Sequence, residues 1–434
     1  MKLLDRFLRR VVRRGELTVT GHDGTRYQYG NPDPGREPVA IRIADRRVGF
    51  DIVRNPRLGA AEAYIDGRIV MEQGEILDLL DLVRSNARWE NGGDKSPLER
   101  GGARIARAYR YLNWERRSRR NVAHHYDLSD RLYSLFLDSD RQYSCAYFTD
   151  AANGLEQAQL DKKAHIAAKL LLKPGQRVLD IGCGWGGMAL YLNRVADVDV
   201  LGITLSEEQL KVARRRAEEA GVADRVRFEL LDYRKVEGRF DRIVSVGMFE
   251  HVGPPHYRTF FRKCRQLLAD DGVMLLHTIG RFGGPGFTDA FTDKYIFPGG
   301  YIPALSETVA ASEKARLMVT DVETLRLHYG LTTQEWYRRA RDHKDEIIAL
   351  YDERFYRMWL FYLAGATVTF RHGGMGNYQI QFARDRHALP LTRDYIHEAE
   401  TRLRAAGSEP RPKARTRRKS DASPGRVLEG AGPE

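Results

Sequence analysis

The sequence predicts an α/β fold, in which a mostly parallel sheet is flanked by helices and preceded by a smaller α+β domain. Two observations support this prediction. From about Asn121 onward, apolar segments typical of strands alternate with amphipathic segments typical of helices, and such alternation indicates a parallel sheet. Before that point, short strand-like and helical segments end at "ENGGDKSPLERGG", where glycine, proline and charge without periodicity indicate a linker.

The chain begins with a basic amphipathic pattern. Apolar residues recur at helical spacing between Leu3 and Val12, and arginines separate them. A helix of this kind either lies in a membrane interface or packs on its own domain with a solvated basic face. The pattern alone leaves both interpretations open.

Glycine, proline and other turn-forming residues mark the ends of the expected strands and helices in the rest of the chain. Short strands are expected from about residue 16 to residue 50, and residues 56–86 are expected to form helical segments broken at Gly67 and Gly74. In the larger domain, the expected strands lie in "QRVLDIG", "VDVLGIT", "RVRFELLD", "FDRIVSVGM", "GVMLLHTIG" and, near Gln379, "YQIQFARD". The expected boundaries are 1–90 for the smaller domain, 91–120 for the linker, 121–398 for the larger domain and 399–434 for a disordered basic tail.

Charge and cysteine content narrow the class of protein. A formal net charge of +12 over 434 residues implies an anionic partner, either nucleic acid or an anionic membrane surface. The three cysteines, Cys145, Cys183 and Cys264, are widely spaced and give neither a disulfide framework nor a zinc pattern, so a reducing cytoplasm is expected. No apolar run is long enough to span a bilayer, and no signal peptide is expected.

The segment "VLDIGCGWGG" predicts a cofactor loop. A buried strand ends near Asp180, and Gly182 and Gly184 then allow a tight turn into a helix and a close approach of the backbone to a ligand. Glycine turns of this kind serve dinucleotides as well as S-adenosylmethionine. A dinucleotide site would have an acidic residue at the end of the second strand, where this chain has Thr204, and the third strand ends at Asp232. This combination favours S-adenosylmethionine.

Together with other segments, this turn resembles the cyclopropane fatty acid synthase family, which includes the mycolic acid cyclopropane synthases. The resemblance covers roughly residues 121–384, in family order, through "NVAHHYDLSDRLYSLFLD", "QYSCAYF", "VLDIGCGWGG", "ITLSEEQ", "GMFEHVG", "LLHTIG", "DKYIFPGG" and "FYLAGATVTFR". It implies a Rossmann-like class I S-adenosylmethionine-dependent methyltransferase fold with a mostly parallel seven-stranded sheet. It also implies that 121–398 is the catalytic domain and 1–90 a lipid- or membrane-associated domain.

The resemblance further implies a reaction and a cofactor site. The family transfers the methyl group of S-adenosylmethionine to a cis double bond of a phospholipid acyl chain, which yields a cyclopropane, S-adenosylhomocysteine and a proton. Carried over to this chain, Tyr143 and Ser144 would close over the cofactor, Asp180, Gly182 and Gly184 would line its amino acid part, Thr204 and Gln209 would reach the ribose, and Asp232 and Tyr233 the adenine.

A bound bicarbonate is the second cofactor that the resemblance implies, held by Cys145, Glu250, His277, Ile279 and Tyr329. The backbone groups of Cys145 and Ile279 are expected to cradle it. Because "QYSCAYF" offers the cysteine only hydroxyl neighbours, we expect Cys145 to have no nucleophilic role. Glu250 and His277 follow adjacent strands, but no third residue at metal spacing accompanies them, and no metal is expected.

One departure from the family concerns a cysteine. Some members carry a cysteine, proposed as catalytic, in the helix that corresponds to "FYLAGATVTF", where this chain has Ala366. That cysteine therefore cannot be required here. The expected partners are an anionic phospholipid membrane, at the cytoplasmic face of the inner membrane, and an unsaturated acyl phospholipid. No nucleic acid partner is expected, and a homodimer is left open.

Three alternatives remain. A nucleic-acid methyltransferase would explain the cofactor loop and the charge, but "FEHVGPPHY" lacks the amide or acid that amino-methylating members place before the prolines. Within lipid chemistry, the same carbocation could lose a different proton or be reduced, which gives a methylene or methyl branch. A non-catalytic lipid-binding protein would have to retain the cofactor loop and the bicarbonate residues without using them.

Overall fold

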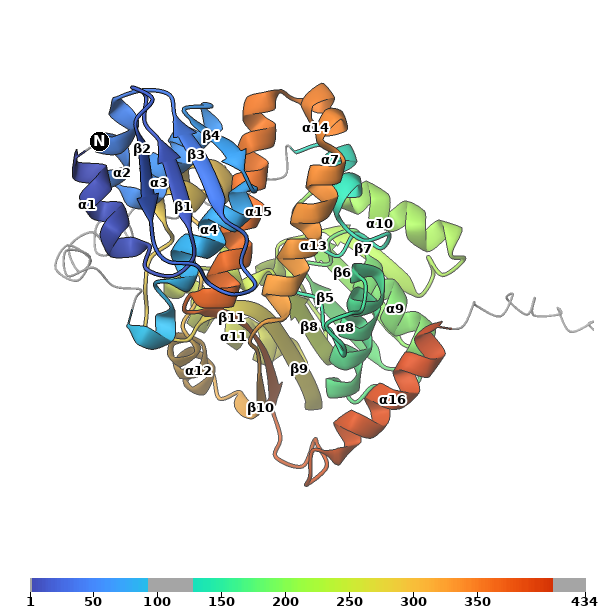
Figure 1. The fold of residues 1–434 in the computed structure, drawn as a ribbon. Coiled ribbons are helices and arrows are strands. Elements are labelled where there is room, and N and C mark those ends of the chain that lie inside the picture. Colours follow the sequence, from blue (N-terminus) through green and yellow to red (C-terminus); the bar gives the residue numbers. More distant parts are fainter. Residues whose placement is uncertain (1, 93–127, 409–434) are drawn as a thin grey trace, which may run out of the picture.

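The computed structural model describes residues 2–92 and 128–408, which form two connected parts (Figure 1). The expected linker at 91–120 and the end of the basic tail lie largely outside these residues. The elements of the first part are α1 (Lys2–Val11), β1 (Leu17–Thr20), β2 (Arg26–Tyr29), β3 (Val39–Ile43), α2 (Arg47–Arg54), α3 (Pro56–Ile65), β4 (Ile69–Gln73) and α4 (Ile76–Ser85).

The second part is larger and contains the main sheet. Its helices and strands are α7 (Asp130–Phe136), α8 (Leu155–Lys169), β5 (Arg177–Ile181), α9 (Gly187–Ala196), β6 (Asp199–Thr204), α10 (Glu207–Glu219), β7 (Val226–Leu230), β8 (Phe240–Val246), α11 (Tyr257–Leu267), β9 (Leu268–Arg281), α12 (Leu305–Lys314), β10 (Met318–Leu325), α13 (His328–Asp342), α14 (Lys344–Leu350), α15 (Glu353–His372), β11 (Met375–Ala383) and α16 (Asp394–Ser408).

The first part is a four-stranded sheet in the order β2-β1-β3-β4 with helices packed on it. β1 is antiparallel to β2 and parallel to β3. The apolar stripe of α1 faces the interior, because Leu4, Leu8 and Val12 are buried in the same core as Leu17 and Ile41. Of the two interpretations of the N-terminal helix, the structure thus supports packing of its apolar stripe on its own domain.

The segment between Gly67 and Gly74 is the strand β4, so the prediction of a helix there was wrong. Both glycines have positive φ, 72° and 77°, and turn the chain at the two ends of the strand. Between them, Ile69 and Val70 are branched residues that favour a strand, and they pair antiparallel with β3. Residues 47–50, in turn, belong to α2 and not to a strand.

The main sheet has seven strands in the order β10-β11-β9-β8-β5-β6-β7. β5 is parallel to β6 and β8, and β11 is antiparallel to both β9 and β10. The predicted fold class, a mostly parallel seven-stranded Rossmann-like sheet, is confirmed. The strand-like segments expected from the sequence include six of these strands and omit the edge strand β10.

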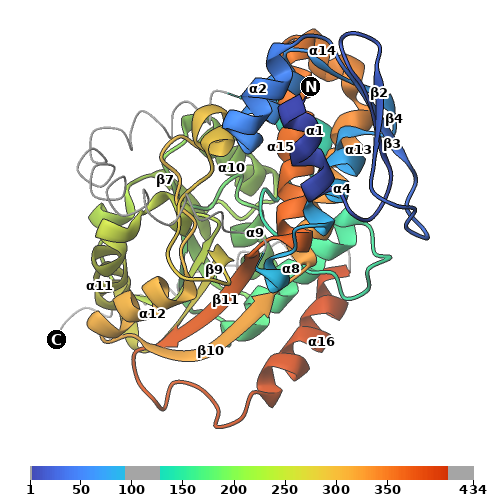
Figure 2. The same cartoon turned by 60° about the vertical axis from the view of Figure 1, so that its left-hand side comes forward.

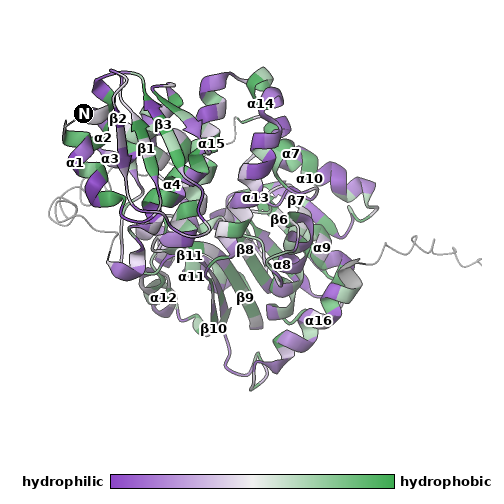
Figure 3. Cartoon of the chain, in the orientation of Figure 1, coloured by the Kyte–Doolittle hydropathy of each residue, from purple (hydrophilic) through white to green (hydrophobic). Residues whose placement is uncertain are grey.

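The main sheet is buried on both faces. Val178 of β5 packs with α8, α9 and α16, whereas the next residue, Leu179, packs with α11 and α12 on the opposite face. Figure 3 shows β8 and β9 as largely hydrophobic, as expected for strands covered on both sides. The strand order reverses at β5, between β6 and β8, and sheets of this type bind ligands at the carboxyl ends of the strands at such a point.

Helices α13 and α15 join the two parts (Figure 2). Arg357 of α15 donates from Nε to the carbonyl oxygen of Ile65 over 2.8 Å, and Tyr337 of α13 donates from its hydroxyl to Glu75 over 2.9 Å. The core that these helices form with α7 also contains apolar side chains of α3 and α4. The two parts therefore share one packed interface.

The C-terminal helix α16 corrects a boundary. It runs from Asp394 to Ser408, and Ile396, Ala399 and Leu403 are buried against the core of α8 and α9. The boundary expected after residue 398 falls inside this helix, so residues 399–408 belong to the folded domain. Among the residues described, none of the helices combines the length and the apolar character needed to cross a bilayer.

Candidate active site

A cavity of about 1920 Å³ lies at the carboxyl ends of β5, β6 and β8 and continues between the two parts of the molecule. Side chains from the glycine turn, from β9, from α13 and α15, and from α1 and α4 contribute to its walls. Every residue that the sequence analysis assigned to the cofactor or to bicarbonate lines this cavity, namely Tyr143, Ser144, Cys145, Asp180, Gly182, Gly184, Thr204, Gln209, Asp232, Tyr233, Glu250, His277, Ile279 and Tyr329.

The two glycines of the turn have different roles. Both have positive φ, 83° at Gly182 and 54° at Gly184. A Cβ on Gly182 would lie only 2.8 Å from Cβ of Met248, so this glycine is required for packing. A Cβ on Gly184 would meet no atom within 4 Å, because this residue faces the open cavity. Gly184 therefore leaves space that a ligand can fill.

Asp180, near the end of β5, offers an unused acceptor. Its side chain is buried, lines the cavity, and has no hydrogen-bond partner at Oδ2 among the described residues. Burial raises the pKa of this carboxyl to about 7, although the nearby charge of Lys162 opposes the rise. A buried acceptor without a donor is costly, so the site fits a ligand that brings a donor, such as the amino group of S-adenosylmethionine.

The next strand ends hold the other expected cofactor residues. Thr204, at the end of β6, donates from Oγ1 to Oε1 of Gln209 over 2.9 Å, and Ser206 caps α10 by accepting from the Gln209 backbone N–H. Asp232 follows β7, and its carboxylate pairs with Arg234 over 2.5 Å. Tyr233 packs edge-on against Phe260. These contacts hold the expected ribose and adenine residues in place at one side of the cavity.

A buried lysine that the sequence analysis missed supports the segment carrying Tyr143 and Ser144. Lys162 of α8 donates to Oε1 of Gln142 over 2.6 Å and to Oγ of Ser144 over 2.8 Å. Burial lowers the pKa of this amine to about 7. Gln159, one turn earlier, donates to the Ser144 carbonyl over 3.0 Å. α8 is buried along most of its length. The only hint of this burial in the sequence is that the helix is alanine-rich and that its polar residues do not gather on one face.

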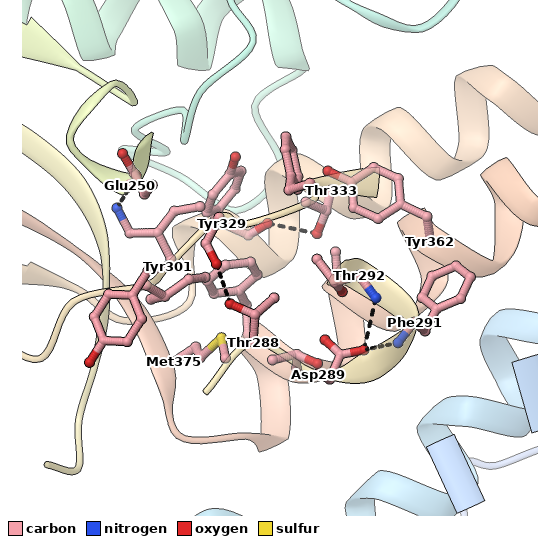
Figure 4. A pocket seen from close by; sticks show the side chains of 18 of the residues that line it. Glu250, Thr288, Asp289, Phe291, Thr292, Tyr301, Tyr329, Thr333, Tyr362 and Met375 are labelled. Atoms are coloured by element: carbon pink, nitrogen blue, oxygen red, sulfur yellow. Dashed lines mark hydrogen bonds between the residues drawn. The ribbon is translucent and has the colours of Figure 1, made fainter. Parts of the chain in front are cut away.

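Glu250 and Ile279 contact each other directly. The backbone N–H of Ile279 donates to Oε1 of Glu250 over 2.6 Å, whereas Oε2 is buried without a partner among the described residues (Figure 4). Burial raises the pKa of Glu250 to about 7. The expectation that the Ile279 amide cradles an anion therefore needs correction, because that N–H is already used to position Glu250.

His277 lies within β9 and is completely buried. Lys169 can only donate, and it donates to Oε1 of Gln379 over 2.8 Å, so the Gln379 amide nitrogen faces Nδ1 of His277 at 3.2 Å. Nδ1 then accepts, and the ring proton resides on Nε2. Burial, and after it the charges of Lys162 and Lys169, lower the pKa of His277 and keep it neutral. Its Nε2 has no described partner, which leaves an N–H donor at the cavity.

Cys145 and Tyr329 complete the predicted group. The thiol of Cys145 is buried and donates to the Ala146 carbonyl over 3.3 Å, and burial raises its pKa, which argues against a thiolate nucleophile. Burial likewise raises the pKa of Tyr329 well above its ordinary value, so its hydroxyl keeps its proton. In the part of the chain that the structure describes, no three His, Cys, Asp or Glu side chains are grouped to hold a metal ion.

Aromatic side chains form much of the remaining wall (Figure 4). Phe297 and Tyr301 come from the aromatic-rich segment "YIFPGGYIP", and Phe361 and Tyr362 come from α15. Residues 130–138 are also rich in aromatic side chains, and two of these, Tyr133 and Phe136, pack against Tyr143. The cavity thus combines a polar end at the glycine turn with an aromatic middle.

The far end of the cavity is apolar and belongs to the first part of the molecule. It is lined by Phe7, Leu8 and Val11 of α1, by Ile41 of β3 and by Leu79 of α4. An elongated ligand with a hydrocarbon chain could extend from the aromatic middle into this end. Ala366 of α15, at the position where some family members carry a cysteine, also lines the cavity.

Several known proteins are similar to this chain. A family model described as mycolic acid cyclopropane synthetase matches residues 114–380. The cyclopropane-fatty-acyl-phospholipid synthase of Escherichia coli (strain K12) is 39% identical over 355 residues, which cover 81% of this chain and 89% of the relative. A probable fatty acid methyltransferase of Pseudomonas putida is 36% identical over 389 residues, with coverage of 86% and 94%. The crystal structure of mycolic acid cyclopropane synthase CmaA1 complexed with SAH and CTAB has a TM-score of 0.58 at 36% identity, covering 60% of this chain and 96% of that one.

Proposed function

This chain belongs to the mycolic acid cyclopropane synthetase family, and from that premise we propose that it converts a cis double bond of a phospholipid acyl chain into a cyclopropane. Family membership makes it an S-adenosylmethionine-dependent methyltransferase of lipid acyl chains. The phospholipid substrate, the cyclopropane product and the use of bicarbonate are the parts that we propose.

One observation supports this proposal most directly: a single cavity contains the cofactor turn, the unpartnered polar atoms of Asp180, Glu250 and His277, aromatic walls and an apolar end. The relative crystallised with SAH and CTAB also bound a cofactor product together with a long alkyl chain. In this chain, the apolar end beside Phe7 and Leu79 offers a comparable place for the substrate chain.

An alkene is a weak nucleophile, so the site must align it with the methyl group and exclude water. S-adenosylmethionine supplies the methyl group and bicarbonate supplies the base when they are bound. The walls of the cavity hold the double bond, and methylation leaves positive charge on the acyl chain. The ring faces of Tyr329, Phe361 and Tyr362 can stabilise that charge. One proton then leaves the new methyl group as the ring closes.

Three polar groups fit a small anion with one acidic hydroxyl. Nε2–H of His277 and the hydroxyl of Tyr329 are donors, and Oε2 of Glu250 is an acceptor when the carboxyl is ionised. Ile279 fixes Glu250 through its amide. Depleting bicarbonate should therefore slow the enzyme, and adding it back should restore the rate. An unchanged rate without bicarbonate would remove it from the proposal.

The proposal also includes peripheral attachment to an anionic membrane at the cytoplasmic face of the inner membrane, since the substrate resides in a bilayer and the chain carries a net charge of +12. A nucleic-acid substrate is not proposed, because the apolar and aromatic walls described above suit a hydrocarbon chain.

The test is lipid analysis of a host that expresses the protein and receives labelled methionine. A gain of CH₂ in unsaturated chains, with label and with resistance to ozonolysis, is expected for the cyclopropane. A host that expresses Gly184→Ala serves as control. Unlabelled, unchanged lipids in the wild-type host would overturn the proposal.

A second candidate is a methylene or methyl branch, which the similarity to a probable fatty acid methyltransferase favours. The same experiment separates the products. A gain of CH₄ indicates a reduced methyl branch, and an ozonolysis-sensitive gain of CH₂ indicates a methylene group.

A further inference from the structure

Two large apolar side chains are exposed on neighbouring helices of the first part. Leu3 of α1 is 59% exposed and Phe50 of α2 is 60% exposed. On α1, the exposed residues Arg6 and Arg10 follow Leu3 at spacings of three and seven residues, which places all three on one side of the helix. On α1, the exposed Leu3 therefore has two arginines on the same side of the helix.

On α2, Arg47, Phe50 and Arg54 repeat the same spacing, and all three are exposed. Figures 1 and 2 both show α1 and α2 side by side at the outer surface of the first part. They pack closely, because a Cβ on Gly49 would lie 3.5 Å from Cβ of Leu4. The two outward stripes therefore form one surface, here called the α1–α2 face, made of Leu3, Arg6, Arg10, Arg47, Phe50 and Arg54.

The charge of this face is not neutralised locally. The acidic residues of the two helices are engaged elsewhere, since Asp5 binds Arg9 and the Tyr29 hydroxyl, each over 3.1 Å, and Asp51 binds Arg68 over 3.0 Å. Within the described ranges, no ion pair is found for the four arginines of the face. Cations around exposed apolar side chains are the pattern of a surface that binds anionic lipid headgroups and inserts into the interface.

The same helices also wall the cavity. Phe7 and Val11 of α1 and Ile52 of α2 line its apolar end, and Asn55 and Pro56, just after α2, line it as well. A bilayer on the α1–α2 face would thus lie beside the end of the cavity that suits an acyl chain. Nucleic acid would satisfy the arginines but would leave Leu3 and Phe50 without an apolar partner.

We propose that the α1–α2 face docks on an anionic lipid bilayer, with Leu3 and Phe50 entering the interface and the four arginines contacting lipid phosphates. The choice of a bilayer as partner rests on the function proposed above. The apolar stripe of α1 is not available for this purpose, because Leu4 and Leu8 fill the core. The face consists of the residues that α1 and α2 present outward.

The test uses the full chain and vesicles of phosphatidylglycerol, with phosphatidylcholine vesicles for comparison. One variant removes the apolar pair, Leu3→Ser with Phe50→Ser, and another removes the charges of the face by changing all four arginines to glutamine. The matched controls are Leu391→Ser, at a fully exposed leucine, and Arg258→Gln with Arg262→Gln, at exposed arginines of α11.

The four-arginine variant should bind phosphatidylglycerol vesicles at least tenfold more weakly, and the apolar variant severalfold more weakly, while both controls bind like the wild type. Turnover of the same phospholipid dispersed in detergent micelles should be unchanged in all variants. Normal vesicle binding by both face variants would overturn the proposal, as would tighter binding of plain duplex DNA or RNA than of vesicles. If the wild type showed no turnover in micelles, that result would count against the proposed function. The binding of the variants to vesicles would still test the docking face independently.

Discussion

Replacing Glu250 by glutamine should make the protein more stable and less active, and the stability gain should grow with pH. Burial raises the pKa of Glu250 from 4.5 to about 7, and a pKa unit corresponds to about 1.4 kcal/mol, so the ionised carboxylate costs the folded state about 3 kcal/mol. Because the folded pKa is the higher one, the cost is absent below about pH 4.5 and complete above about pH 7. Glutamine removes this charge and still accepts from the Ile279 amide.

Urea unfolding of the wild type and of Glu250→Gln at two pH values measures this cost. Between pH 5.5 and pH 8.5, the variant should gain about 2 kcal/mol relative to the wild type, since part of the cost is already present at the lower value. Any pH-independent effect of the amide cancels in this difference. The surface variant Glu237→Gln is the control and should follow the wild type at both values.

Activity should change in the opposite direction. The rate of the wild type should rise through about pH 7 as Glu250 ionises, and the glutamine variant should lose about 2–4 kcal/mol of transition-state stabilisation, or about 30- to 1000-fold in rate. The reasoning fails if the stability difference is the same at both pH values, or if the variant turns over normally.

Three other changes test the rest of the site. Gly184→Ala should weaken the binding of S-adenosylhomocysteine at least tenfold, as measured by calorimetry. The control is Gly221→Ala, which should bind normally because Gly221 has a similar φ of 66° but does not line the cavity. Equal affinities of the two variants would mean that the turn does not contact the cofactor. Cys145→Ser should keep activity within about tenfold, and a dead variant would restore a nucleophilic role. Gln379→Glu keeps an acceptor for Lys169 but cannot donate to His277, so the imidazole proton should move from Nε2 to Nδ1, which ¹⁵N NMR detects. The kcat should then fall about tenfold with KM unchanged. A proton that stays on Nε2 would refute the assigned tautomer.

The position of the residues expected to bind the cofactor, at one edge of the sheet, could be predicted from local sequence alone. In a parallel sheet the residues after each strand converge on one edge, so Asp180, Thr204 and Asp232 could be found by locating strand ends. The glycine turn needed no tertiary information either, because the positive φ of Gly182 already favours glycine, and the close approach of Met248 adds to that requirement.

Features that depend on contacts between distant segments could not be predicted. Lys162 is buried only because the segment around Ser144 folds over α8, and a lysine in a helix is ordinarily a surface residue. The use of the Ile279 amide by Glu250 is a backbone contact and has no side-chain signature. β10 mixes polar and apolar residues at the sheet edge, so it lacks the continuous apolar run of the inner strands. For α1, helical periodicity predicted the apolar stripe, but it could not show that this stripe packs on the core of its own domain.

Helix α15 is a structural element of both parts. Arg354 pairs with Asp66 over 3.0 Å and Arg357 binds the Ile65 carbonyl, while Tyr362 and Ala366 of the same helix line the cavity. Rotation of the first part away from the sheet would therefore pull on a wall of the reaction chamber. Any change in the angle between the two parts would therefore alter the volume of the cavity, and a ligand that fills the cavity would oppose such a change.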